Sequence, residues 1–287
     1  MAIAFGVFLS LVALVAWGVG DFLIQRTTRL VGSAKALFFI GVVAFVALLP
    51  FVFVELPHLT VANFTLLATL SVVVILGAAF DFEALRKGKI AVIEPVVGLE
   101  LPMTVIMTVI FLGESFTPLQ IFLMVLVFGG TALTVTRDIK HLTRLFEKGV
   151  LLAFLAAVGT ALTSVMVGFS SQEISPLVSI WFSHGTLALV SGIVILSSGG
   201  MRSILKDIIK NPVTIGSQSV LDNVAWIAFA FAATMIPISI ATTISGGYVA
   251  LGVLLGIFVS REKVKTHQAL GIAFVSIGVI VLSYFYG

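Results

Sequence analysis

The sequence has no cysteine, and only 10% of its 287 residues are charged. Without cysteine the chain has no disulfide framework and no thiolate metal site, and its redox compartment cannot be inferred from thiols. A soluble domain carries about 25% charged residues, so this chain lacks the polar surface that water requires. With 60% hydrophobic residues, its main solvent is expected to be the lipid bilayer.

The apolar residues are organised in ten blocks of about 20, each long enough as a helix to cross a hydrocarbon core of about 30 Å. Runs such as 72–75 and 251–257 lack the strict alternation of a membrane β-barrel strand. We therefore predict an all-α integral membrane protein with ten transmembrane helices. Charge, Pro and Gly bound these spans at 3–24, 34–54, 63–82, 89–112, 118–136, 149–169, 176–197, 213–233, 237–259 and 267–286.

The longest polar connection, 137–148, divides the ten spans into two halves of five. At an offset of 148 residues without gaps, several residues of the two halves coincide: Gly98 with Gly246, Glu114 with Glu262, and Gln120 with Gln268. We therefore predict two repeats, 1–140 and 149–287. Because five is odd, the second repeat crosses the membrane in the opposite sense, which is the inverted repeat of many secondary transporters.

Short motifs in both halves resemble those of a known family. The first span contains WGVGDF at 17–22, similar to a WG-x-x-D-F opening, and the first half closes with LGE at 112–114 before a Gly-rich final span. The chain is similar in these features to the EamA-type transporters of the drug/metabolite transporter superfamily. The second half departs from the pattern, with SRE at 260–262 and Thr243 in the place of Pro95. The resemblance implies export or exchange of metabolites, with amino acids, nucleotide derivatives, sugar phosphates and drugs all among the substrates.

Two acidic residues lie at the middle of apolar spans, Glu100 in the fourth and Asp222 in the eighth. An ionisable group at the bilayer centre costs at least about 2.5 to 3.5 kcal/mol, so each is expected to face a cavity or a partner. Since both lie at the same depth, we predict one shared cavity. Its expected walls are the polar and aromatic residues on the same helix faces, Thr104, Ser219, Asn223 and Trp226, with Thr242 and Thr243 on the ninth span.

The sequence leaves the role of these two acids open. They could be structural, protonated and hydrogen-bonded to neighbouring helices, because burial disfavours the charged form of a carboxylate. They could carry a coupling proton. They could also attract a cationic or zwitterionic solute, to which Trp226 or Trp17 would add a cation–π contact of about 0.5 to 2 kcal/mol.

Two further acids, Asp21 and Glu94, lie about one turn from the basic loops. Each could form a gate or a structural ion pair at the headgroup level, or contact the substrate. Glu94 and Glu100 are six residues apart and point about 120° apart, so only one of them is expected to face the cavity. Glu114 is expected to cap the helix start beside it, and His184 to be a packed, hydrogen-bonded residue.

Several functional classes lack their motifs. No P-loop, HExxH or GxSxG motif occurs, and the four histidines form no cluster of metal ligands. We therefore expect no enzyme activity, no cofactor, no metal and no nucleic-acid partner. The leading hypothesis is a secondary active transporter, exporter or exchanger, that moves a small organic metabolite by alternating access and draws on gradients. The alternatives are a channel or lipid scramblase and an intramembrane enzyme.

All 16 Lys and Arg residues lie in or beside the loops after spans one, three, five, seven and nine, or in the first turn of the next span. The positive-inside rule places these loops in the cytoplasm and both termini outside. This departs from the family that the chain resembles, whose members commonly have cytoplasmic termini. We expect a multi-pass protein of the plasma or inner membrane that works as a monomer or homodimer.

Overall fold

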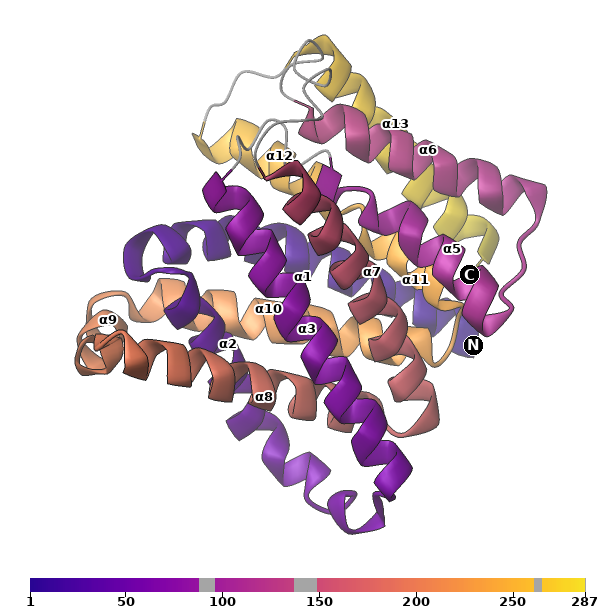
Figure 1. Cartoon of the computed structure of the whole chain (residues 1–287). Coiled ribbons are helices and arrows are strands. Elements are labelled where there is room, and N and C mark those ends of the chain that lie inside the picture. The colour runs from indigo at the N-terminus through magenta and orange to yellow at the C-terminus, as the bar shows by residue number, and fades with distance from the viewer. Residues whose placement is uncertain (88–95, 137–148, 261–264, 287) are drawn as a thin grey trace.

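The structure is a computed structural model that describes residues 1–87, 96–136, 149–260 and 265–286. All regular secondary structure in these ranges is helical, which confirms the predicted fold class (Figure 1). The elements are α1 (Ala2–Val31), α2 (Ser33–Val52), η1 (Leu56–His58), α3 (Val61–Lys87), α5 (Glu100–Leu112), α6 (Pro118–Val135), α7 (Val150–Glu173), α8 (Pro176–Ser197), η3 (Gly200–Ser203), α9 (Ile204–Lys210), α10 (Pro212–Ala233), α11 (Ile238–Ser245), α12 (Tyr248–Ser260) and α13 (Thr266–Tyr286).

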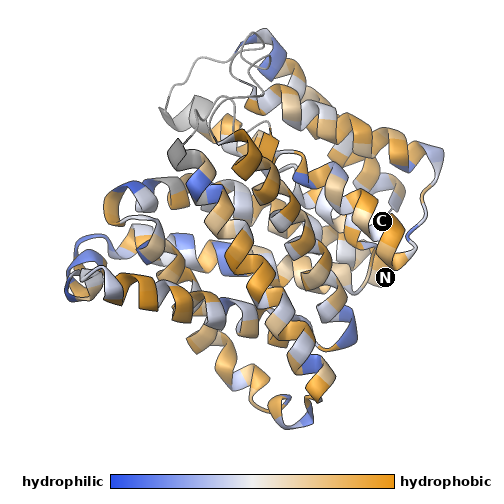
Figure 2. Ribbon diagram, viewed as in Figure 1, coloured by the Kyte–Doolittle hydropathy of each residue, from blue (hydrophilic) through white to orange (hydrophobic). Residues whose placement is uncertain are grey.

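Eight helical segments in the described ranges are long and apolar enough to cross a membrane. Large apolar side chains such as Phe51, Ile110 and Ile280 point outward and are well exposed, as suits a surface that faces lipid. Figure 2 shows hydrophobic residues along the bodies of the long helices and hydrophilic ones gathered toward their ends. The chain is therefore an integral, multi-pass membrane protein. Helix α10 is not among the eight segments, because its buried polar residues lower its hydropathy.

The sequence explains where several helices begin. Thr117 caps α6 in a capping box, in which its backbone N–H donates to Gln120 Oε1 over 2.8 Å. The repeat-related Gln268 does the same at α13, where it accepts from the backbone N–H of Lys265 over 3.1 Å. The coincidence of the two glutamines at an offset of 148 therefore reflects one local function in both halves.

Glu114 has a different role from the predicted one. It does not cap the neighbouring helix α6, because Thr117 already does so. Its carboxylate instead accepts from the backbone N–H of Ile238 over 2.6 Å, and from the backbone N–H and hydroxyl of Ser239, at the start of α11. The prediction that it caps a helix start was therefore right in kind and wrong in place. Its counterpart Glu262 lies outside the described residues.

The fourth and ninth predicted spans are interrupted at equivalent positions. Residues 98–99 form a turn directly before α5, and residues 246–247 form the turn between α11 and α12. The two turns are separated by the repeat offset of 148 residues, so the aligned Gly98 and Gly246 mark the same break in each half. The ninth span is therefore two short helices in place of the single continuous one predicted.

Helices of one half pack against those of the other in a repeated pattern. In the repeat, α1 corresponds to α7 and α3 corresponds to α10. Helix α1 packs on α10 and α3 packs on α7, so each contact is the other with the two halves exchanged. Helix α2 packs on its own counterpart α8, and α6 on its counterpart α13. This exchange is what a pseudo-twofold relation between two five-span halves produces, so the repeated architecture is visible in the contacts as well as in the sequence.

The contact between α6 and α13 shows this symmetry at atomic detail. A Cβ atom on Gly130 would lie 2.8 Å from the backbone N of Val275, and one on Gly278 would lie 2.6 Å from Val127 Cγ2. Gly130 and Gly278 are related by the offset of 148, as are Val127 and Val275. Gly130 on α6 and Gly278 on α13 thus allow the two helices to approach closely, each at the equivalent position of its own half.

Candidate solute-binding cavity

A cavity of about 190 Å³ lies between the two halves, where both interrupted spans meet. Its wall comes from six helices of both halves and from the turn after α11. The lining residues are Trp17 and Asp21 of α1, Glu100 and Leu101 of α5, Thr160 and Ser164 of α7, Asp222, Trp226 and Phe229 of α10, Thr242 and Ser245 of α11, Gly246, and Tyr248 of α12.

The end of α11 approaches the start of α5 at this cavity. A Cβ atom on Gly246 would lie 2.6 Å from Leu101 Cδ2, so a larger residue there would require the Leu101 side chain to move. Glu100 is the first residue of α5 and Tyr248 the first of α12, and both line the cavity. Broken helices whose ends face a midplane cavity are the arrangement by which transporters expose polar groups to a solute.

Four aromatic rings form one side of the cavity. Trp17 stands edge-on to Trp226 with ring centroids 5.0 Å apart, and it also contacts Phe229 at 5.8 Å and Tyr248 at 6.0 Å. Trp226 and Phe229 are themselves 6.1 Å apart. These contacts join α1, α10 and α12, so the rings are held in place by three helices and offer a rigid aromatic wall.

Three carboxyl groups line the same cavity, those of Asp21, Glu100 and Asp222. They come from three different helices, and among the described residues no Lys or Arg lines this cavity. Carboxylates in a site of low dielectric attract cations more strongly than they would in water. The cavity is therefore suited to a positively charged group.

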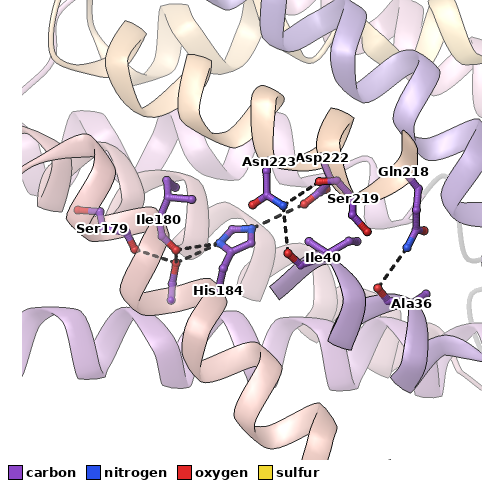
Figure 3. A network of polar contacts seen from close by, with 10 residues as sticks. Ala36, Ile40, Ser179, Ile180, His184, Gln218, Ser219, Asp222 and Asn223 are labelled. Atoms are coloured by element: carbon purple, nitrogen blue, oxygen red, sulfur yellow. Dashed lines mark hydrogen bonds and ion pairs between the residues drawn. The ribbon is translucent and has the colours of Figure 1, made fainter. Parts of the chain in front are cut away.

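Asp222 belongs to a buried polar network, which Figure 3 shows from close by. Its side chain Oδ2 lies 3.6 Å from Nε2 of His184 on α8. The next residue, Asn223, donates from Nδ2 to the carbonyl of Ile40 over 3.0 Å, and Gln218 donates from Nε2 to the carbonyl of Ala36 over 3.2 Å. Both carbonyls belong to α2, so α10 is tied to α2 on either side of the Asp222 turn.

Six of the residues predicted for the site line the cavity: Trp17, Asp21, Glu100, Asp222, Trp226 and Thr242. Four others lie outside its wall. Thr104 and Thr243 donate to the carbonyls of Glu100 and Ser239, four residues back in their own helices. Ser219 does the same with Ile215, and Asn223 faces α2. Glu94 lies outside the described residues.

Two kinds of contact were not predicted. The first is the lining of the cavity by Ser245 and Tyr248, which lie on either side of the break at 246–247. Tyr248 could have been found, because it stands at the repeat offset from Glu100. The second is the partner of His184. Only local packing was predicted for this residue, whereas the structure places it against Asp222. No local pattern connects these two residues.

A repeated bundle of membrane-crossing helices around a polar cavity defines the class of protein as a multi-pass transporter. The sequence profile of the EamA-like transporter family matches residues 4–136 and 147–284, one copy in each half. The chain therefore belongs to the EamA-like transporter family, within the drug/metabolite transporter superfamily, as its motifs predicted. This is a family of transporters and not of enzymes, which agrees with the expected absence of enzyme activity.

The fold is also found among solved structures, of which 28 chains match. One of them, titled only "Crystal structure of protein", superposes with a TM-score of 0.71 at 15% sequence identity, over 98% of each chain. At that identity the likeness shows the fold alone. No curated protein matches the chain.

Proposed function

We propose that the chain is a secondary active transporter that moves a small cationic or zwitterionic metabolite across the bilayer by alternating access. One observation carries this proposal: three carboxyl groups and four aromatic rings share a cavity between the two halves. Transport of a small molecule follows from the family, and the charge of the solute is inferred from the cavity.

The solute class rests on charge and on ring geometry together. Carboxylates supply attraction for an ammonium group, and a Trp face within about 6 Å of a cation adds about 0.5 to 2 kcal/mol. The cavity of about 190 Å³ is smaller than the 300 to 1,000 Å³ of typical drug-sized sites, which favours a compact solute. A small amine, quaternary ammonium compound or amino acid satisfies both conditions.

The mechanism rests on the repeat. We propose that residues 1–140 and 149–287 act as two inverted repeats that rock against each other around the cavity, as an exporter or an exchanger. Close approach of helices from different halves at Gly130 supports this, as do the two breaks, which start α5 and α12 at the cavity. All cavity walls belong to one chain, so a monomer is sufficient for this function.

The orientation is also a proposal. The loops that carry the Lys and Arg residues would face the cytoplasm, with both termini outside, in a plasma or inner membrane. The described ends are consistent with this distribution, because Arg26, Arg29, Lys35 and Arg202 share one side with α9, whereas the described parts of the opposite ends carry acids such as Glu55 and Glu173.

Binding can be tested with the two cavity tryptophans as reporters. The chain has three Trp residues, and Trp181 stacks on Phe45 away from the cavity, with centroids 5.0 Å apart. Tetramethylammonium, added to purified protein, should change Trp fluorescence saturably. The Trp226→Phe variant should lose most of this signal, and the Trp181→Phe variant should keep it.

Transport itself is tested by counterflow of labelled solute in liposomes, first with tetramethylammonium and then across a library of amines, amino acids and anionic metabolites. A carrier shows saturable counterflow, whereas a channel or scramblase does not. Counterflow restricted to anionic solutes, or no fluorescence response to any cation, would contradict the proposed solute class.

A further inference from the structure

The buried contact between His184 and Asp222 is not explained by solute binding alone. His184 is 6% exposed and Asp222 is 8% exposed, and the ion-pair distance between Nε2 and Oδ2 is 3.6 Å. Asp222 lines the cavity, whereas His184 lies behind it on α8. We infer that His184 and Asp222 together form a proton-binding site, and that this proton is exchanged for the positive charge of the solute. The inference rests on the proposed function and adds the identity of the coupling ion.

The tautomer of His184 follows from its other nitrogen. Nδ1 lies 3.1 Å from the carbonyl oxygen of Ile180, one turn back in α8. A carbonyl can only accept, so Nδ1 must carry a hydrogen. The hydroxyl of Ser183, 3.4 Å from Nδ1, donates to the carbonyl of Ser179 over 2.8 Å and does not compete for this role. Nε2 therefore faces Asp222 either with a lone pair or with a second proton.

The number of protons in the contact follows from this tautomer. With one proton, the pair is either an imidazolium beside a carboxylate or a neutral ring beside a carboxylic acid, and both are attractive and have no net charge. Without it, the Nε2 lone pair faces a carboxylate, which is repulsive, and the pair has a net charge of one negative unit. Loss of the proton therefore releases a carboxylate charge to the cavity, where a cation can neutralise it.

Because loss of one proton leaves one negative charge on the pair, the proposed exchange is one proton for one positive charge. Across the cavity, Asp222 faces Asp21 of α1 and Glu100 of α5. The other ionisable residues of α1, and those of the further elements packed on α8 and α10, lie near the helix ends or in the loops. Those whose side chains the structure describes are Arg26, Arg29, Lys35, Asp81, Glu83, Glu173, Arg202, Lys206, Asp207 and Lys210. Among the side chains that the structure describes, no Lys or Arg lines the cavity beside Asp222, and a positively charged solute is therefore the proposed competitor of the proton.

Helix α2 holds the two partners in register. A Cβ atom on Gly41 would lie 2.5 Å from the carbonyl oxygen of His184, so α8 approaches α2 as closely as a glycine allows. The same stretch of α2 accepts the hydrogen bonds from Gln218 and Asn223 of α10 at Ala36 and Ile40. Because both helices are fixed to one scaffold, the contact between His184 and Asp222 is preorganised and does not depend on a bound solute.

The proton site can be tested without any solute, by ¹⁵N NMR of histidine-labelled protein in detergent. The chain has four histidines, and the signal lost in His184→Gln identifies His184. We expect the Nδ1–H tautomer in the neutral ring. We also expect the Nε2 signal of His184 to shift in Asp222→Asn, because an amide then replaces the carboxyl group that Nε2 faces. Glu55→Gln, on a distant loop, is the matched control. An Nε2–H tautomer, or an unchanged Nε2 signal in Asp222→Asn, would overturn the proton site.

Coupling is tested separately in liposomes. A pH gradient should drive tetramethylammonium accumulation of about tenfold per pH unit, as a one-for-one exchange requires, with no dependence on membrane potential. His184→Gln should keep counterflow and lose gradient-driven accumulation. If His184→Gln still accumulates the cation like the wild type, coupling at this pair is wrong and the proposed transport function stands. If no cation binds in any variant, the proposed function fails, and the NMR result alone decides whether the proton site exists.

Discussion

The carboxylate of Glu114, at the end of α5 in the first half, accepts a hydrogen bond from the backbone N–H of Ile238, at the start of α11 in the second half. A helix start leaves its first N–H groups without intrahelical partners, and a carboxylate there also interacts favourably with the helix dipole. Glu114 therefore links the two halves at one end of the cavity-lining helix α11, through hydrogen bonds that also involve Ser239.

Glu114→Ala should lower the stability of the folded protein by about 1 to 3 kcal/mol, because it removes a charge-assisted cap and leaves buried donors unpaired. Thermal unfolding in detergent would measure the loss. Glu55→Ala, which removes an acid from the segment between α2 and α3, should change the melting temperature little. Equal melting temperatures for the two variants would show that the cap contributes no stability.

Two adjacent glycines of α6 should respond differently to the same substitution. A Cβ atom on Gly130 would lie 2.8 Å from backbone atoms of Gly271 and Val275, so Gly130→Ala must push α13 away and should cost about 1 to 3 kcal/mol. At Gly129 nothing lies within 4 Å of the added Cβ, so Gly129→Ala should be neutral or slightly stabilising, since alanine favours a helix by up to about 1 kcal/mol. Thermal unfolding of both variants checks this difference, and a larger loss at Gly129 would contradict it.

Orientation can be measured directly because the chain has no cysteine of its own. Single cysteines at Ala2, His58 and Met201 all lie at exposed positions. If the basic loops are cytoplasmic, an impermeant thiol reagent applied to intact cells should label Ala2→Cys and His58→Cys and spare Met201→Cys. Labelling of Met201→Cys alone would reverse the proposed topology, and permeabilised cells serve as the control for reagent access.

Much of the fold could be predicted from the spacing of apolar residues and from one sequence offset. The offset of 148 aligned Gly98 with Gly246, and these residues mark the break in each half. Prolines in the fourth and ninth spans indicate kinks there, but the turns themselves could not be located, because the ninth span reads as one continuous apolar block. Nothing in a run of apolar residues shows that the end of α11 must approach the start of α5, as Gly246 and Leu101 do.

The site was predicted less completely than the fold. Helical periodicity identifies residues that share a face, but it does not show which neighbouring helix covers that face. Thr243 satisfies its hydroxyl within its own helix, and Asn223 turns toward α2, so neither enters the cavity wall. The partners of Glu114 and His184 lie far away in the sequence, and only the packing of helices from different halves brings them together.

Glu100 and Thr104, one turn apart on α5, offer a matched pair of variants that tests the proposed site. Glu100 lines the cavity, whereas Thr104 is fully buried and donates to the carbonyl of Glu100 over 2.9 Å. Glu100→Gln removes a negative charge and keeps the shape of the side chain. Two opposite unit charges about 5 Å apart attract each other by about 3 kcal/mol at an effective dielectric constant of about 20, so the affinity for tetramethylammonium should fall about tenfold or more.

Thr104→Val should leave that affinity within about twofold, because the hydroxyl bonds only to a backbone carbonyl that already accepts in the helix, and the volume is conserved. Fluorescence titration of both variants measures the two affinities under the same conditions, and circular dichroism confirms that each remains helical. Equal losses would mean that the α5 turn acts through packing and not through charge. A loss confined to Thr104→Val would place the solute contact on the other face of α5 and contradict the assignment of Glu100 to the site.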